Sequence, residues 1–147
     1  MTSNKDLLIA GGKVMTDDRL RHSLAVATKM KDMASEGFKA DMFILGFLHD
    51  IGYEFCDDTK KHNLIGGLKL KEGGYKYWQE VYYHGEHQTQ YSSAVLDLLN
   101  KADLMTGPQG QNMSACERLE DIAQRYGKDS HQYRESFLLA KKLGVIR

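Results

Sequence analysis

Proline is nearly absent from this sequence: Pro108 is the only one among 147 residues. Stretches in which Val, Ile or Thr alternate with polar residues are also few. Proline interrupts helix interiors, and period-two alternation is the pattern of half-buried strands, so both shortages favour helices over sheets. The fold class that we expect is therefore all-α, a single compact bundle of about six to seven helices.

Cysteine is scarce, and neither sign of charge is in excess. Cys56 and Cys116 are far apart and fit no CxxC zinc pattern. Two cysteines in a chain of this size favour free thiols in a reducing compartment over a disulfide framework. The 20 basic and 20 acidic residues balance to a formal net charge of zero, which predicts neither nucleic acid nor an anionic membrane as a partner.

Long hydrophobic runs are missing as well. No run approaches the roughly 20 apolar residues of a membrane span, and residues 7–10 are too short for the core of a signal peptide. We therefore expect a cytoplasmic protein that does not contact a membrane. The composition, 41% apolar and 27% charged residues, is typical of a globular protein, and we expect one domain over residues 1–147.

Ser, Thr and Asp residues that precede apolar periodic segments mark the expected helix starts. These caps are Thr16 or Asp17, Asp41, Ser92 or Ser93, Ser114, and Ser130. Further helices are expected over residues 61–70 and 75–83, each of which a glycine follows. In the first helix, apolar residues at helical spacing define the predicted buried face: Leu20, Leu24, Ala27 and Met30. His22 is expected at the edge of that face.

The apolar stretch 43–52 contains an adjacent imidazole and carboxylate near its end, His49 and Asp50. Burying a charge is costly unless the charge is paired or bound to a metal. On its own, this doublet is either a hydrogen-bonded structural pair or half of a metal site.

Other histidines and one aspartate recur near the ends or along one face of different predicted helices. Together with the doublet, these candidates are His22, His62, His84, His87 and Asp103. Helical bundles build metal sites from side chains on facing helices. A set of imidazoles and carboxylates without thiolate suits Fe, Mn, Zn, Co or Ni better than a structural zinc. The pattern therefore indicates a metal site with open coordination positions.

The order of these residues resembles the HD-domain superfamily of metal-dependent phosphohydrolases. Residues 21–27 are similar to that family's first histidine motif, residues 48–52 to its namesake doublet, and residues 100–104 to its closing aspartate. The resemblance covers about residues 17–110, which leaves the C-terminal helices of residues 111–147 outside it. It implies a helical HD-type domain.

Two further matches resemble small bacterial HD hydrolases that bind two metals, such as the symmetrical dinucleoside-tetraphosphate hydrolases. They are residues 62–67, which follow a histidine with small residues, and Tyr83-His84-Gly85. The resemblance implies one metal held by His22, His49, Asp50 and Asp103, and a second held by Asp50, His62 and His84. Iron is the first expectation for both ions. The residues after His84 and after Asp103 depart from the family pattern, so the family's substrate is not carried over.

The activity that the resemblance implies is hydrolysis of a phosphoester or phosphoanhydride bond in a small molecule such as a nucleotide. His49 and Asp50 are the expected catalytic residues, and metal charge would stabilise the transition state without an arginine. Side chains expected to bind the phosphorylated substrate are Arg19, Lys60, Lys61, Lys101 and His87. The aromatic residues of segment 75–83 either pack in the core or stack on a nucleobase.

Three other readings of the same residues remain open at this point. Some small HD proteins that resemble this one are di-iron oxygenases with the same six ligands. A non-catalytic metal or nucleotide sensor would also keep the ligands, and a purely structural helical protein would bind no metal. A homodimer is likewise left open.

Overall fold

The computed structural model describes residues 16–55 and 61–146. These residues form seven α-helices and one short 3-10 helix, with no strand among them. In chain order the elements are α2 (Asp17–Met33), α3 (Lys39–Leu48), η1 (Ile51–Glu54), α4 (His62–Glu72), α5 (Trp78–Tyr83), α6 (Ala94–Leu104), α7 (Ala115–Tyr126) and α8 (His131–Leu143). The all-α prediction is confirmed. Within the described ranges, no helix is both long and apolar enough to cross a membrane.

Hydroxyl side chains cap the helices where the sequence predicts them. The side chains of Thr16, Ser93, Ser114 and Ser130 each accept a hydrogen bond from a backbone N–H in the first turn. The prediction that Asp41 caps α3 is wrong: the helix begins at Lys39 after Phe38, and no side chain caps it. Asp41 instead lies in the first turn, where a negative charge interacts favourably with the helix dipole.

The buried face of α2 is rotated from the one predicted. Leu24 is 50% exposed, whereas Ala27 and Met30 are buried as expected, and His22 and Val26 are buried with them. The rotation follows from the packing of α3, because a Cβ at Gly46 would lie 2.6 Å from the Cα of Ala27. Only glycine allows the two backbones to approach so closely. The result brings His22 from the edge of α2 onto its buried side.

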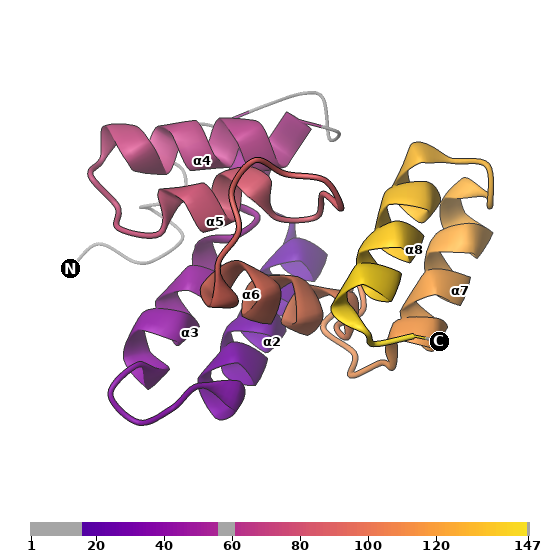
Figure 1. The fold of residues 1–147 in the computed structure, drawn as a ribbon, viewed down its shortest axis with the longest axis horizontal. Coiled ribbons are helices and arrows are strands. Elements are labelled where there is room, and N and C mark those ends of the chain that lie inside the picture. The colour runs from indigo at the N-terminus through magenta and orange to yellow at the C-terminus, as the bar shows by residue number, and fades with distance from the viewer. Residues whose placement is uncertain (1–15, 56–60, 147) are drawn as a thin grey trace.

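Two apolar clusters hold together the helices that Figure 1 labels. The larger cluster joins α2, α3, α5 and α6 and consists of Val26, Met30, Met42, Leu45, Val81, Leu99 and Ala102. The smaller cluster joins the end of α6 to α7 and α8 and consists of Leu104, Leu119, Leu139 and Ala140. Helices α7 and α8 form a hairpin at one end of the molecule, and α6 lies between that hairpin and the remaining helices.

Candidate metal centre

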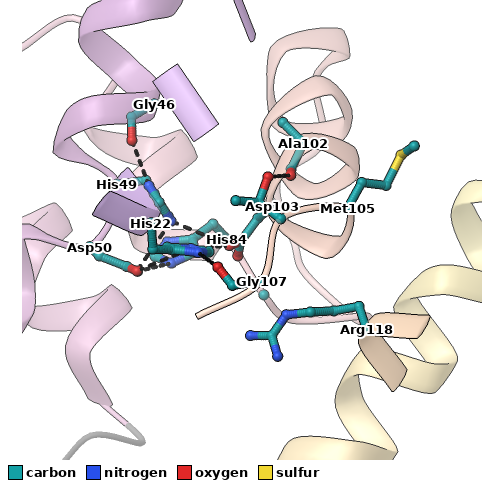
Figure 2. Close-up of polar contacts among 12 residues, drawn as sticks. His22, Gly46, His49, Asp50, His84, Ala102, Asp103, Met105, Gly107 and Arg118 are labelled. Atoms are coloured by element: carbon teal, nitrogen blue, oxygen red, sulfur yellow. Dashed lines mark hydrogen bonds and ion pairs between the residues drawn. The ribbon is translucent and has the colours of Figure 1, made fainter. Parts of the chain in front are cut away.

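Six side chains from different elements converge beside α6, and all of them except His62 are labelled in Figure 2. They come from within α2 and α6, from the ends of α3 and α5, from the start of α4, and from the residue before η1: His22, Asp103, His49, His84, His62 and Asp50. All six are the metal ligands that the family resemblance implies. Buried groups drawn from them have ligand atoms close enough together to hold a metal ion.

One oxygen of Asp50 faces the first set of donors. Its Oδ2 lies 3.2 Å from Nε2 of His49 and 3.6 Å from Nε2 of His22. Asp103 completes this set, because its Oδ1 lies 2.8 Å from Nε2 of His22 and 3.4 Å from Nε2 of His49. Two imidazole nitrogens and two carboxylate oxygens thus face one another.

The other oxygen of Asp50 faces the second set. Its Oδ1 lies 3.2 Å from Nε2 of His62 and 3.3 Å from Nε2 of His84. The two ring nitrogens lie 3.3 Å apart. Asp50 therefore stands between two groups of donors, with one carboxylate oxygen directed at each.

Backbone carbonyls orient three of the rings by accepting from Nδ1. His49 donates to the carbonyl oxygen of Gly46 and His84 to that of Val81, each 2.6 Å away and three residues earlier in the chain. The Val81 carbonyl oxygen also accepts a hydrogen bond from the backbone N–H of His84, so it holds both the end of α5 and the His84 ring. His22 donates in the same way to Gly107, 2.8 Å away. With the proton on Nδ1, each ring directs the lone pair of Nε2 inward.

A bound cation explains the contacts among these six side chains better than hydrogen bonds alone do. Nε2 of His49 is buried and has no hydrogen-bond partner. His22 faces oxygen atoms with both ring nitrogens, yet a neutral imidazole has one N–H and donates only once. A metal ion that accepts the Nε2 lone pairs and the carboxylate oxygens satisfies all of these atoms. The residues present can therefore hold a metal ion.

The pKa values reflect the same concentration of charge. Burial opposes ionisation of Asp50 and Asp103, but the adjacent His49 outweighs it and holds the pKa of both carboxyl groups well below the usual range. The pKa of His49 is in turn raised well above 6.5, because the two carboxylates outweigh burial. Burial, together with the neighbouring His62 and His49, lowers the pKa of His84. Without a metal, the cluster thus keeps a proton on His49.

A cavity of about 260 Å³ opens above the centre. Its floor contains His22, Asp50, His62, His84 and Asp103, and its walls come from the start of α2, from η1, from the turn after His84, and from the α7–α8 hairpin. This volume lies just below the range of about 300–1,000 Å³ for pockets that hold drug-sized ligands. The cavity is suited to a small ligand.

An aromatic ring holds a guanidinium at one wall of the cavity. Tyr53 stacks on His62 with a ring separation of 4.2 Å and an interplanar angle of 7°. On the same ring, the guanidinium carbon of Arg19 lies 3.8 Å from the centroid. Arg19 and Tyr53 both line the cavity. The stack places a positive charge next to the second set of donors.

The other residues predicted to bind substrate lie elsewhere. Lys60 is outside the described residues. Lys61 is exposed at the start of α4, and neither it nor Lys101 lines the cavity. His87 does not line it either, and its Nδ1 contacts Glu135 of α8. In segment 75–83, Tyr75 and Tyr77 pack against the larger apolar cluster, which agrees with the core alternative rather than with nucleobase stacking.

The α7–α8 hairpin contributes side chains to the cavity that the sequence pattern did not indicate. Arg118, Tyr126, His131 and Glu135 all line it, together with Glu86 from the turn after His84. No local signal distinguishes Arg118 from Arg125 on the same helix, because both are spaced to pair with Asp121. Only the packing of the hairpin against α6 brings these side chains to the centre.

Comparisons with protein-family models, with curated proteins and with solved structures gave no significant match. The function of the chain is therefore inferred from the geometry and chemistry of this centre.

Proposed function

We propose that the chain is an HD-type metal-dependent phosphohydrolase that cleaves a phosphoester or phosphoanhydride bond of a small molecule. The observation that carries this proposal is the position of Asp50, whose two carboxylate oxygens face two separate sets of donors. An aspartate so placed is suited to bridge two metal ions. The guanidinium of Arg19 in the cavity wall favours an anionic substrate.

The two sets of donors define the proposed binding sites. His22, His49, Asp103 and Oδ2 of Asp50 would hold one ion, and His62, His84 and Oδ1 of Asp50 the other. Divalent ions held there supply Lewis acidity, which lowers the pKa of water towards neutrality and neutralises charge on a phosphoryl group. A donor set of imidazole and carboxylate suits Fe, Mn, Zn, Co or Ni, and iron is our first expectation.

The protein's own residues orient the reacting groups. The carbonyl oxygens of Gly46, Val81 and Gly107 fix three of the histidine rings through Nδ1. The guanidinium carbon of Arg19 lies 3.8 Å from the centroid of the Tyr53 ring, and its N–H groups would donate to phosphoryl oxygens of the substrate. In the reaction, a water oxygen adds to phosphorus and the bond from phosphorus to the leaving oxygen breaks. The leaving group takes up a proton, and phosphate is the second product.

The proposal is tested by metal analysis combined with a phosphate-release screen. The protein is purified without added metal, its metal content is measured, and nucleotides and small phosphomonoesters are offered as substrates. We expect about two equivalents of metal per chain and phosphate release from at least one substrate class. Removal of the metal with a chelator should abolish release, and its return should restore it.

Other outcomes of the same experiment separate the alternatives. Two equivalents of iron with O₂ uptake and no phosphate release would favour the oxygenase. Metal binding with neither activity would favour a sensor. A protein that takes up no metal even after reconstitution would reject the whole proposal.

A further inference from the structure

Arg118 lines the cavity of the candidate metal centre and comes from a part of the chain outside the family resemblance. The resemblance ends near residue 110, whereas Arg118 lies within the first turns of α7 and lines the same cavity as the metal ligands. Its side chain points from α7 towards the cluster of histidines and aspartates (Figure 2). The C-terminal hairpin therefore supplies a cation to the site.

Arg118 is a largely buried charge with only part of its hydrogen-bonding capacity used. Its side chain is 18% exposed, and its Nη1 donates to Oδ2 of Asp121 at 2.9 Å. That carboxylate also accepts from Nε of Arg125 at 3.1 Å, so one negative charge serves two guanidiniums. Arg118, Asp121 and Arg125 together carry a net positive charge. Because a guanidinium has five N–H donors, Arg118 keeps donors free for a ligand in the cavity.

Several contacts hold the hairpin, and with it Arg118, in place. Leu119, the next residue along α7, packs with Leu139 of α8 and Leu104 of α6. On α8, Glu135 contacts the His87 ring, and Lys142 donates to the His87 carbonyl oxygen at 3.1 Å. The turn that follows the metal-ligand candidate His84 is thus tied to the hairpin. Arg118 is a fixed part of the cavity wall.

We propose that Arg118 binds the phosphoryl group of the substrate through its guanidinium, from the side of the cavity formed by α7. This inference rests on the proposed function and adds to it a catalytic arginine that the family resemblance did not lead us to expect. A planar guanidinium matches two phosphoryl oxygens at once. Charge on those oxygens redistributes during transfer, so the contact stabilises the transition state as well as the bound substrate. Asp121 acts as a positioning residue that fixes the guanidinium.

Arg125 offers a matched control, because it pairs with the same carboxylate but does not line the cavity. The experiment compares Arg118→Gln with Arg125→Gln in the metal-loaded protein. We expect Arg118→Gln to lower kcat/KM for phosphate release about 100-fold. Arg125→Gln should stay within about threefold of the unchanged protein, as for an exposed ion pair. Arg118→Lys keeps the charge but loses the planar guanidinium, so its kcat/KM should lie between those of Arg118→Gln and Arg125→Gln.

Binding of inorganic phosphate gives a readout that does not depend on turnover. Calorimetric titration of each metal-loaded variant should give a Kd for phosphate at least about tenfold weaker in Arg118→Gln than in Arg125→Gln. Equal kinetics and equal phosphate affinity in these two variants would overturn the inference. So would loss of metal from Arg118→Gln alone, since the residue would then support the centre rather than the substrate. If Arg118→Gln does not fold, the comparison of Arg118→Lys with Arg125→Lys decides.

Failure of this inference differs from failure of the proposed function. If the unchanged protein binds metal and releases phosphate, but Arg118→Gln matches Arg125→Gln, only the role of Arg118 is wrong. If the unchanged protein neither releases phosphate nor binds it, the hydrolase proposal itself is rejected, and the role of Arg118 with it.

Discussion

Nδ1 of His22 donates a hydrogen bond to the carbonyl oxygen of Gly107, which lies 85 residues further along the chain. The bond leaves Nε2 of the same ring 2.8 Å from Oδ1 of Asp103. A backbone carbonyl in the loop after α6 thus determines which nitrogen of a histidine in α2 faces the centre. Loss of such an outer contact typically lowers metal affinity or activity by about 10- to 100-fold.

Asp50→Ala should abolish metal binding and activity while leaving the helices largely intact. Both oxygens of Asp50 are lost, and these are the atoms that face the two donor sets. We expect metal content to fall from about two equivalents to almost none, with little change in circular dichroism. Asp97→Ala, at an exposed site in the first turn of α6, is the control. Loss of helicity in metal-free unchanged protein would instead make the metal structural.

His87→Ala should leave metal content unchanged. The His87 side chain contacts Glu135 on α8 and does not face the centre. Loss of this part-buried contact should lower the free energy of unfolding by about 1 kcal/mol. Elemental analysis and chemical denaturation measure the two effects. A drop in metal content would show that the set of ligands proposed here is incomplete.

Metal affinity should rise with pH across neutrality. In the metal-free protein the pKa of His49 is raised well above 6.5, so the ring carries a proton that must leave before Nε2 binds a metal. His84, whose pKa is lowered by burial, is already neutral and releases none. We expect the apparent affinity to increase about tenfold per pH unit between pH 6.5 and the raised pKa. Competition with a chelator at several pH values tests this, and a flat profile would contradict it.

The stability of the metal-free protein should change in the opposite direction over that range. Protonation of His49 stabilises the fold fully below pH 6.5, and this contribution is lost as the pH rises through the raised pKa. The lowered pKa values of Asp50 and Asp103 give a separate contribution, which is present above pH 3.8 and lost as the pH falls below it. Denaturant unfolding of chelator-treated protein at pH 6 and pH 8 measures the first effect. Greater stability at pH 8 would contradict the assigned proton.

Gly46→Ala should destabilise the protein and disturb the centre. The added Cβ would lie 2.6 Å from the Cα and 2.8 Å from the N of Ala27, so α2 and α3 must move apart. We expect a loss of more than about 2 kcal/mol of unfolding free energy, together with weaker metal binding, since the Gly46 carbonyl orients His49. Gly73→Ala is the control, because its nearest contact is an ordinary 3.6 Å and its φ is −81°. Equal stability of the two variants would contradict the close packing of α2 and α3.

Local patterns in the sequence predicted where most of the helices lie, although the helix expected over residues 75–83 begins only at Trp78. Ser114 and Ser130 precede apolar segments at helical spacing, and both cap helices where expected. Asp41 does not cap α3 because the cap position is occupied by Phe38, which lies before Asp41 in the chain and has no side chain that can accept a hydrogen bond. The prediction that Leu24 is buried was also wrong. Apolar periodicity identifies an apolar face of a helix, but it does not identify the element that packs on that face. The close contact at Gly46 of α3 determines which face of α2 is buried.

The histidines and aspartates of the centre were predictable because each lies near a recognisable helix end or face, in a recognisable order. The side chains that form the opposite wall of the cavity could not be predicted from the sequence. Arg118 and Glu135 reach it only through the packing of the hairpin on α6, which depends on tertiary contacts such as that of Leu119 with Leu139. Proximity in sequence to a ligand was likewise a poor guide, since Lys61 adjoins His62 and yet lies outside the cavity.

The donors of the centre are spread along the chain from His22 to Asp103, and the carbonyl that orients the first of them is at Gly107. During synthesis, the four histidines and Asp50 are made before the last ligand and that carbonyl. The first set of donors can close only after residue 107 has emerged from the exit tunnel. If the centre binds metal as proposed, the finished fold rather than the nascent chain would select the ion.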